Sequence, residues 1–180
     1  MDSVRRGGGE RNAEDRAMTR VVYPGTFDPV TRGHLDVIRR AAEMFDEVVI
    51  GVGNNPSKKT AFSSRERAAM MRREVRGLKN VSVRTFRGLV TAFAKARRAS
   101  FILRGVRTVA DFEYEIQMAI ANRASAGVET VFMTPSPEFE FISGSLIKEI
   151  VGMGGDAGDL VSPEVAEKLR AKLCKGRRKT

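Results

Sequence analysis

The sequence predicts an α/β fold in which helices cover a doubly wound sheet of five parallel strands, with further helices at the C-terminal end. Three observations lead to this prediction. The 180 residues are 42% hydrophobic and 30% charged, which suits one globular domain with a sizeable core. Five short apolar runs alternate with segments of helical periodicity, as in sheets built from parallel strands and crossover helices. Polar turns follow several of these runs, at the edge where such sheets bind ligands.

The first half of the chain alternates between strand and helix signals. A β-rich run at 20–23 precedes a turn, and the helix expected over 32–44 carries Leu35, Ile38 and Ala42 at helical spacing. A continuous apolar run, EVVIGV at 47–52, predicts a buried strand. Ser63 and Glu66 have the spacing of a capping box, which opens a helix that runs to about residue 77.

The second half repeats the alternation. A strand is expected at 81–85, a helix at 89–98, a strand at 100–103, a long helix at 108–126 and a last strand at 129–133. Two short helices follow at 145–151 and 163–173, the second opened by Pro163. Right-handed crossovers and a switch in strand order are expected, so the residues just after the strands are candidates for a binding site.

Charge and composition divide the chain into three parts. Residues 1–17 are rich in glycine and charge and are expected to be disordered, residues 18–173 form the domain, and residues 174–180 are a basic tail. The formal net charge is +10, but residues 168–180 hold seven Lys or Arg and no acid, so the rest of the chain carries only +3. A basic end is usually solvated, and an aromatic content of 7% offers few stacking platforms, so no nucleic-acid partner is expected.

Composition also argues against several other classes. Cys174 is the single cysteine, so neither a disulfide framework nor a Cys/His metal cluster can form, which suits a reducing compartment. No apolar run approaches roughly 18 residues, and the N-terminus has no apolar core of a secretory signal. We therefore expect a cytoplasmic protein with no membrane span.

The one histidine of the chain, His34, lies at the most informative turn. Gly25 and Thr26 follow the first strand, and Gly33 and His34 open the next helix. A helix N-terminus offers free N–H groups and partial positive charge, which favour phosphate, and a histidine there can donate a hydrogen bond to a phosphate oxygen. The two glycines would let the backbone approach a ligand closely. The alternative is an ordinary surface histidine in a strand–helix connection.

Three further segments after strands carry groups that bind anions. The loop after the second strand ends in Lys58 and Lys59, which are compact positive charges. Arg104 and Arg107 follow the fourth strand, and arginine binds phosphate in a bidentate way. Residues 142–145, ISGS, open a helix with hydroxyls and a glycine. Each segment alone has an ordinary explanation as solvated surface or helix cap, but together they indicate a polyphosphate substrate and a second phosphorylated molecule.

These segments resemble the bacterial phosphopantetheine adenylyltransferase family. Thr31, Gly33 and His34 match the TxGH form of the nucleotidyltransferase HxGH motif, which alone indicates only the superfamily. The more specific segments are RGVR followed by DFEYE, and PSKK. Taken in order, the similar segments cover essentially residues 18–173 and are YPGTFDPVTRGH (23–34), PSKK (56–59), LRGVRTVADFEYE (103–115) and FISGSLIKE (141–149).

The resemblance implies a Rossmann-like fold and a reaction. ATP and 4′-phosphopantetheine would give dephospho-coenzyme A and pyrophosphate reversibly, in the penultimate step of coenzyme A biosynthesis. The phosphate of phosphopantetheine would attack the α-phosphorus of ATP in line, with no covalent enzyme intermediate, so catalysis would consist of positioning and charge stabilisation. The implied cofactor is Mg²⁺, bound mainly through the ATP phosphates. The family is typically a homohexamer, and coenzyme A is its expected feedback ligand.

The resemblance also implies roles for individual residues. His34 would stabilise the transition state at an ATP phosphate, together with Lys58 and Arg107 as catalytic residues, and Thr26 would position the attacking phosphate. The implied ATP site consists of Thr26, Phe27, His34, Gly105, Val106, Arg107, Glu115, Phe139, Glu140, Phe141, Ile142, Ser143, Gly144 and Ser145. The implied phosphopantetheine site consists of Thr26, Lys58, Val90 and Arg104.

The sequence departs from the family pattern in two places, and three alternatives stay open. Gly144 stands where the family has the middle serine of ISSS, which puts a side-chain phosphate contact in doubt but not a backbone N–H contact. The segment 123–131 is one residue shorter than in common relatives. The alternatives are a sister nucleotidyltransferase that uses nicotinamide mononucleotide or a cytidine nucleotide, a basic nucleic-acid-binding protein, and a nucleotide sensor without activity.

Overall fold

The computed structural model describes residues 18–54 and 59–174 and contains the expected parallel sheet. Neighbouring strands all pair in parallel, in the order β3-β2-β1-β4-β5. This order reverses between β1 and β4, so the C-terminal ends of these two strands form the switch point of the sheet. The predicted Rossmann-like α/β fold is confirmed. The strands are β1 (Arg20–Gly25), β2 (Glu47–Gly53), β3 (Val81–Phe86), β4 (Phe101–Gly105) and β5 (Glu129–Met133).

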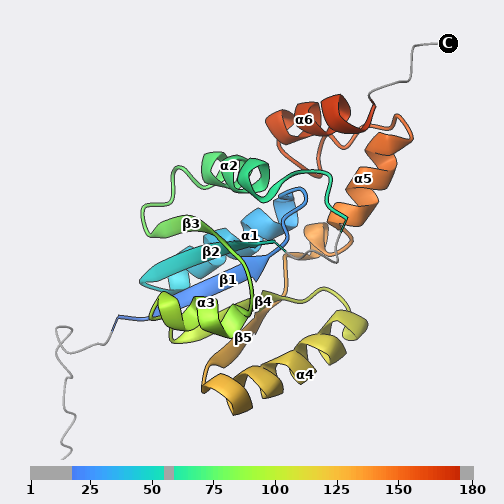
Figure 1. Cartoon of the computed structure of the whole chain (residues 1–180). Helices are drawn as coiled ribbons and strands as arrows, with labels where there is room; N and C mark the ends of the chain where they lie inside the picture. The colour runs from blue at the N-terminus through green and yellow to red at the C-terminus, as the bar shows by residue number, and fades with distance from the viewer. Residues whose placement is uncertain (1–17, 55–58, 175–180) are drawn as a thin grey trace, which may run out of the picture.

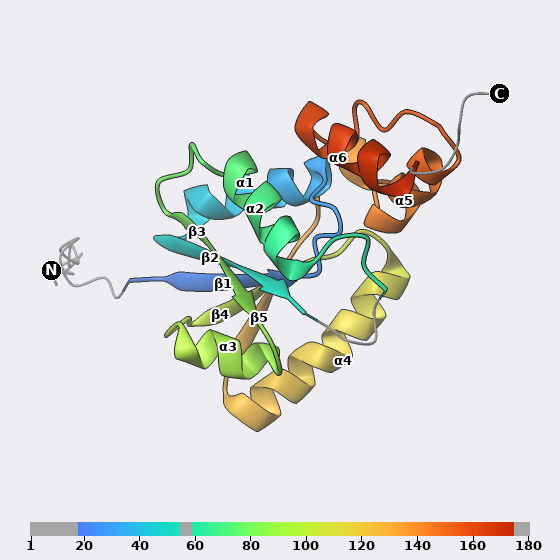
Figure 2. The ribbon, with the colours of Figure 1, turned by 45° about the horizontal axis from the view of Figure 1, so that its top comes forward.

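Helices lie on both faces of the sheet (Figures 1 and 2). One face carries α1 (Arg32–Met44) and α2 (Ser64–Glu74), and the other carries α3 (Val90–Ala96) and α4 (Val109–Ala126). After β5 a 3₁₀ turn, η2 (Pro137–Phe139), leads to α5 (Gly144–Gly152) and α6 (Pro163–Leu173). These last two helices pack on each other and belong to the same core as α1 and α2.

The sheet divides the hydrophobic core into two clusters. The larger cluster joins strand side chains such as Val21 and Ile50 to α1, α2, α5 and α6. The smaller cluster joins Val22 and Ile102 to Phe93 of α3. Among the described residues α4 has none that is buried, although Phe112 on this helix makes an edge-to-face contact with Phe132 of β5 at 5.3 Å between ring centroids. The helix α4 therefore covers its face of the sheet loosely.

Some boundaries differ from the expected ones by a few residues. The helix expected over 63–77 ends at Glu74, and the helix expected over 89–98 is shortened to Val90–Ala96, after which Arg98 adopts a φ of 51°. The predicted disorder of residues 1–17 and most of the predicted basic tail lie outside the described residues. Cys174 is described, and its Sγ donates to the carbonyl of Val151 at 3.3 Å. In the described ranges no helix is long and apolar enough to cross a membrane.

Candidate active site

Two cavities meet at the switch point of the sheet. The first, of about 550 Å³, lies between the ends of β1 and β4 and the N-terminus of α5. The second, of about 610 Å³, lies between the loop before α3 and the side of α4. Their walls share one set of side chains, so a ligand in one cavity lies next to a ligand in the other. The shared residues are Tyr23, Thr26, Phe27, His34, Arg104, Gly105 and Glu115.

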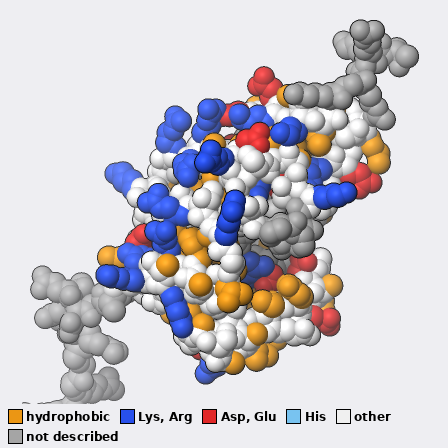
Figure 3. All heavy atoms as spheres, in the orientation of Figure 1, with side chains coloured by type: hydrophobic (Ala, Val, Ile, Leu, Met, Phe, Trp, Pro, Cys, Tyr) orange, Lys and Arg blue, Asp and Glu red, His pale blue; other side chains and the backbone are white. Residues whose placement is uncertain are grey.

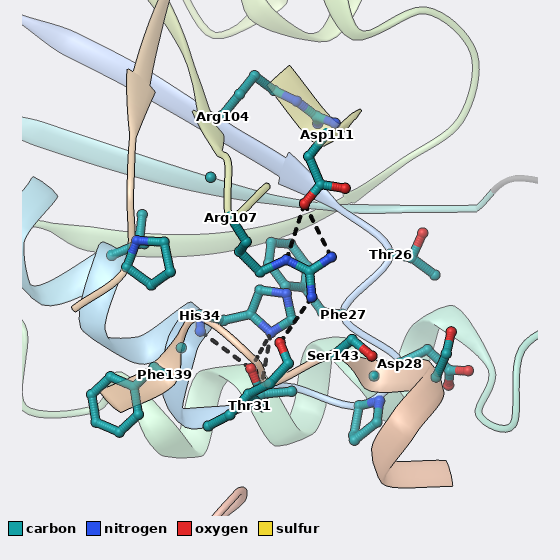
Figure 4. Close-up of a pocket in the computed structure, with 18 of the residues that line it drawn as sticks. Thr26, Phe27, Asp28, Thr31, His34, Arg104, Arg107, Asp111, Phe139 and Ser143 are labelled. Carbon is teal, nitrogen blue, oxygen red and sulfur yellow. Dashed lines mark hydrogen bonds and ion pairs between the residues drawn. The ribbon is translucent and has the colours of Figure 1, made fainter. Parts of the chain in front are cut away.

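His34 is held at the start of α1 by a reciprocal capping box with Thr31. The hydroxyl of Thr31 accepts from the backbone N–H of His34 at 3.3 Å, and the backbone N–H of Thr31 donates to Nδ1 of the imidazole at 3.1 Å. Because Nδ1 accepts this hydrogen bond, the neutral ring carries its hydrogen on Nε2. The local structure therefore gives His34 a fixed orientation and leaves Nε2–H as the donor for a ligand (Figure 4).

The surroundings of His34 favour its uncharged form. Burial is the larger cause and the nearby positive charge of Arg107 the smaller, and together they lower the pKa of His34 from 6.5 to about 4. The ring also makes an edge-to-face contact with Phe27, at 5.0 Å between centroids. At neutral pH, His34 can therefore donate a hydrogen bond to an anion without first taking up a proton.

This lowered pKa makes the stability of the fold depend on pH. Between pH 6.5 and about 4 the unfolded chain binds a proton at His34 that the folded chain does not, so folding stability falls as the pH falls through this window. We expect His34 to contribute on the order of 1–3 kcal/mol to this loss. Urea unfolding of wild type and His34→Asn at pH 7, 5.5 and 4.5 measures this contribution. The carboxylates are the same in both proteins, so their effect cancels in the difference between the two free energies of unfolding. A difference between the two proteins that does not change with pH would contradict this assignment.

The two arginines at the end of β4 are each paired with an acid on α4. Arg104 makes a bidentate contact with Glu115, with Nε to Oε2 at 2.7 Å, and also donates to the carbonyl of Pro24. Arg107 contacts Asp111 at 3.2 Å and donates to the carbonyl of Ile142 at 3.0 Å. Figure 4 places the guanidinium of Arg107 between His34 and Asp111. Both arginines therefore line the cavity in fixed positions, tied to the first turns of α4.

Of the two glycines that sequence reasoning assigned to ligand approach, Gly25 is also required by a neighbouring side chain, whereas a Cβ on Gly33 would make only ordinary contact with its neighbours. A Cβ on Gly25 would lie 2.7 Å from the ring of Phe27, and a Cβ on Gly33 would lie 3.4 Å from the carbonyl oxygen of Phe139. Phe27 itself adopts a φ of 50° and is 3% exposed. A side chain held in this strained region marks a turn that the surrounding packing determines.

Gly144 is explained in the same way. The side chain of Ser143 caps α5 by accepting from the N–H of Leu146 at 3.1 Å, which leaves the N–H groups of Gly144 and Ser145 in the first turn available to an anion. A Cβ on Gly144 would lie 2.9 Å from the backbone oxygen of Asp28. The close approach of α5 to the turn after β1 therefore leaves no room for the serine that the family pattern has at this position.

We expect Gly144→Ser to destabilise the fold rather than to improve the site. The new Cβ must displace backbone, which costs about 1–3 kcal/mol. Thermal unfolding and turnover of the variant test this. Gly152→Ala, near the other end of α5, is the matched control, because a Cβ there meets nothing within 4 Å. A Gly144→Ser protein as stable and as active as wild type would show that the turn after β1 yields easily.

The structure brings together most of the residues that sequence reasoning assigned to the site. All but three residues of the implied ATP site line the first cavity. The exceptions are Val106, which is buried, Phe141, which is 62% exposed, and its neighbour in the sequence, Glu140. Thr26, Val90 and Arg104 of the phosphopantetheine set line the second cavity. Lys58 lies outside the described residues. The neighbouring Lys59 lines the first cavity.

Sequence reasoning missed four residues at this site. Tyr23 lines both cavities, and burial raises the pKa of its phenol to about 12, so it stays protonated. Asp28 and Lys148 line the first cavity and pair with each other at 2.8 Å, and Arg67 is a fully buried arginine beneath them. The sequence could have predicted the burial of Arg67, because this residue falls on the apolar face of α2 with Ala68. It offers no such signal for Asp28, which looks like an ordinary turn residue.

The described part of the chain offers no cluster of three or more His, Cys, Asp or Glu side chains that could hold a metal ion. The carboxylates of the first cavity, those of Asp28, Asp111 and Glu115, are each paired with a cation.

A TxGH turn and a row of cationic and N–H groups along the switch point of a parallel sheet are the features expected of a nucleotidyltransferase. Residues 22–150 match the family model described as cytidylyltransferase-like, and the chain belongs to this family. The class of reaction is transfer of a nucleotidyl group from a nucleoside triphosphate. A solved structure described as a "Putative Nicotinate-nucleotide Adenylyltransferase from Vibrio parahaemolyticus" is similar in fold, with a TM-score of 0.61 and 19% identity over 85% of this chain and 99% of that one.

Proposed function

We propose that this chain transfers the adenylyl group of ATP to 4′-phosphopantetheine, giving dephospho-coenzyme A and pyrophosphate. The observation that carries the proposal is the common wall of the two cavities, which contains Thr26, His34 and Arg104. ATP would occupy the first cavity and the acceptor the second. The acceptor phosphate and the α-phosphorus of ATP would then meet at this wall, with Thr26 and Arg104 on the acceptor phosphate.

The chemistry needs no covalent bond to the protein. An oxygen of the acceptor phosphate bonds to the α-phosphorus, the bond from that phosphorus to the β-phosphate oxygen breaks, and pyrophosphate leaves. His34 donates from Nε2 to the phosphoryl oxygens, and Arg107 and the N-terminus of α5 bind the phosphates that leave. Mg²⁺ carried by the triphosphate supplies further neutralisation of charge.

The second cavity suits an elongated acceptor. Its apolar walls come from the start of α3, at Leu89 and Val90, and from α4, at Met118 and Ala119. Asn122 adds a polar group. A pantetheine arm has both apolar methylenes and amides, which match such a lining better than a purine or pyridine base would. Coenzyme A carries the same arm, so it would compete for this cavity.

Pyrophosphate release identifies donor and acceptor together. Purified protein with Mg²⁺ is mixed with ATP or CTP, and with 4′-phosphopantetheine, nicotinate mononucleotide, nicotinamide mononucleotide or no acceptor. Release with ATP and phosphopantetheine, with an equal amount of dephospho-coenzyme A, is the expected result. Release with a pyridine mononucleotide would keep the class of reaction and overturn the acceptor. A folded protein that releases pyrophosphate in no mixture would favour the sensor alternative.

The proposal includes assembly through α4. In the part of the chain that is described this helix buries no residue, and Figure 3 shows hydrophobic side chains gathered over its side of the molecule. Tyr114 and Ile120 on it are 62% and 65% exposed, and hydrophobic side chains gathered on one surface mark a protein–protein contact more often than singly exposed ones do. We expect a homo-oligomer, the resemblance suggesting a hexamer, and we expect Ile120→Glu to lower the mass measured by light scattering. Met44→Glu, on α1, should leave it unchanged. A monomeric wild type would overturn this part of the proposal.

A further inference from the structure

Asp28 is the most heavily engaged carboxylate of the first cavity. Its side chain is 3% exposed. One oxygen, Oδ2, accepts from the backbone N–H of Ala61 and from Nζ of Lys148, both at 2.8 Å, and the other, Oδ1, accepts from the backbone N–H of Phe62 at 3.0 Å. The carboxylate therefore joins three segments that are far apart in the sequence: the turn after β1, residues 59–62 before α2, and α5.

A buried guanidinium joins two of these segments, the turn after β1 and residues 59–62, to the end of β2. Arg67 is 1% exposed, and it donates to the carbonyls of Thr26, of Gly53 at 3.0 Å and of Phe62 at 3.1 Å. These carbonyls belong to the turn after β1, to the end of β2 and to residues 59–62. A guanidinium has its donors in a rigid fork, so it sets the relative positions of the three carbonyls and not merely their proximity.

The third segment, α5, also approaches Asp28 closely. The backbone oxygen of Asp28 would lie 2.9 Å from a Cβ on Gly144, so the first turn of α5 lies directly against the turn after β1. Lys148, one turn further along the helix, reaches the carboxylate of the same residue. Any displacement of Asp28 would therefore move both residues 59–62 and the N-terminus of α5 relative to His34.

We propose that Asp28 is a positioning residue, which holds residues 59–62 at the first cavity so that Lys59, from the wall of that cavity, reaches the acceptor phosphate where the two cavities meet. This inference rests on the proposed function for the identity of the acceptor. Asp28 itself stays bound to protein groups and does not contact substrate. Its two hydrogen bonds to peptide N–H groups carry the positioning, and its ion pair with Lys148 is a separate contribution on the side of the nucleotide phosphates.

Two variants separate these contributions. Asp28→Asn keeps the shape of the side chain. When its amide oxygen faces Ala61 and Lys148, its NH₂ group faces the N–H of Phe62, so the hydrogen bond from Phe62 is lost. Lys148→Met leaves both peptide hydrogen bonds in place and removes only the ion pair. The double variant Asp28→Asn with Lys148→Met removes the partly buried ammonium that Asp28→Asn leaves without a carboxylate.

The experiment measures amide hydrogen exchange of Ala61 and Phe62, together with KM for ATP and for 4′-phosphopantetheine and kcat. In Asp28→Asn we expect exchange at Phe62 to quicken and KM for the acceptor to rise, each by about tenfold, with a smaller change in KM for ATP. In Lys148→Met we expect exchange at Phe62 and KM for the acceptor to stay within about threefold of wild type. The double variant should recover thermal stability but keep the raised acceptor KM.

Two results would overturn the inference. One is a Lys148→Met protein that reproduces the whole acceptor effect of Asp28→Asn, which would assign the effect to the ion pair. The other is an Asp28→Asn protein whose KM values for ATP and acceptor change equally and recover with stability in the double variant, which is the behaviour of a merely structural residue. Hydrogen exchange needs no substrate, and the kinetics can use whichever acceptor supports turnover in wild type. A wrong acceptor would therefore overturn the proposed function without deciding the role of Asp28.

Discussion

Replacing His34 with alanine should lower kcat by about three powers of ten while the protein stays folded. The expected loss is large because His34 offers the Nε2–H donor at the wall that the two cavities share, and its neutral form needs no proton from solution. The fold should survive, since the helix keeps the Thr31 hydroxyl as an N-cap. Steady-state kinetics and circular dichroism of the purified variant measure both quantities.

Two further substitutions at this position separate catalysis from capping. An asparagine places an amide near the position of Nδ1, so it can keep the bond to the N–H of Thr31 while it lacks the distal donor. A glutamine reaches further and can offer an N–H near the position of Nε2. We expect His34→Asn to be as inactive as His34→Ala and His34→Gln to retain part of the activity. An asparagine variant with near-normal turnover would show that capping, not donation to substrate, is the role of this histidine.

Replacing Arg107 with methionine should lower kcat/KM for ATP by about two powers of ten. The guanidinium faces the first cavity beside His34 and also holds the carbonyl of Ile142 at 3.0 Å, at the start of the segment that leads into α5. Its loss removes a positive charge from the wall of the first cavity and loosens the approach to the N-terminus of this helix. It also removes one of the two causes that lower the pKa of His34, so that pKa should rise in the variant.

Arg107→Lys is the matched control, because it separates the effect of the positive charge from the effect of the guanidinium's geometry. A lysine keeps the positive charge but cannot contact both Asp111 and the Ile142 carbonyl with a fixed fork. We expect intermediate kinetics, with KM for ATP raised more than kcat is lowered. Initial rates over a range of ATP concentrations test whether kcat/KM for ATP falls in the order wild type, Arg107→Lys, Arg107→Met. A methionine variant within threefold of wild type would remove Arg107 from the site.

The elements of the fold could be predicted closely where local signals are strong. The helices at 32–44 and 163–173 and the strand at 129–133 begin and end where the sequence indicates. The strand β1 extends two residues beyond the predicted end, because Pro24 and Gly25 look like turn residues but pair with Gly51 and Val52 of β2. Such extensions depend on the neighbouring strand, which local propensity does not contain.

The candidate site could be predicted in part. His34, Arg104 and Arg107 are signalled by their place after strands, and all three line the first cavity, where their roles stay predictions. Their partners are not signalled, because Glu115 meets Arg104 and Asp28 meets Lys148 only once the chain has folded. The reason for Gly144 is likewise invisible in the sequence, since it lies in the backbone of a turn more than a hundred residues away.

The common wall of the two cavities also bears on what happens after the chemical step. A reaction that joins their occupants leaves one molecule lying across Thr26 and His34, anchored at both ends. Such a product keeps the contacts of both substrates except those of the departed pyrophosphate, and it loses translational freedom only once, so we expect it to dissociate more slowly than the acceptor alone. Pyrophosphate, held from one side alone, should leave first. Under the proposed function we therefore expect departure of the joined product to limit the rate of turnover in the wild-type protein.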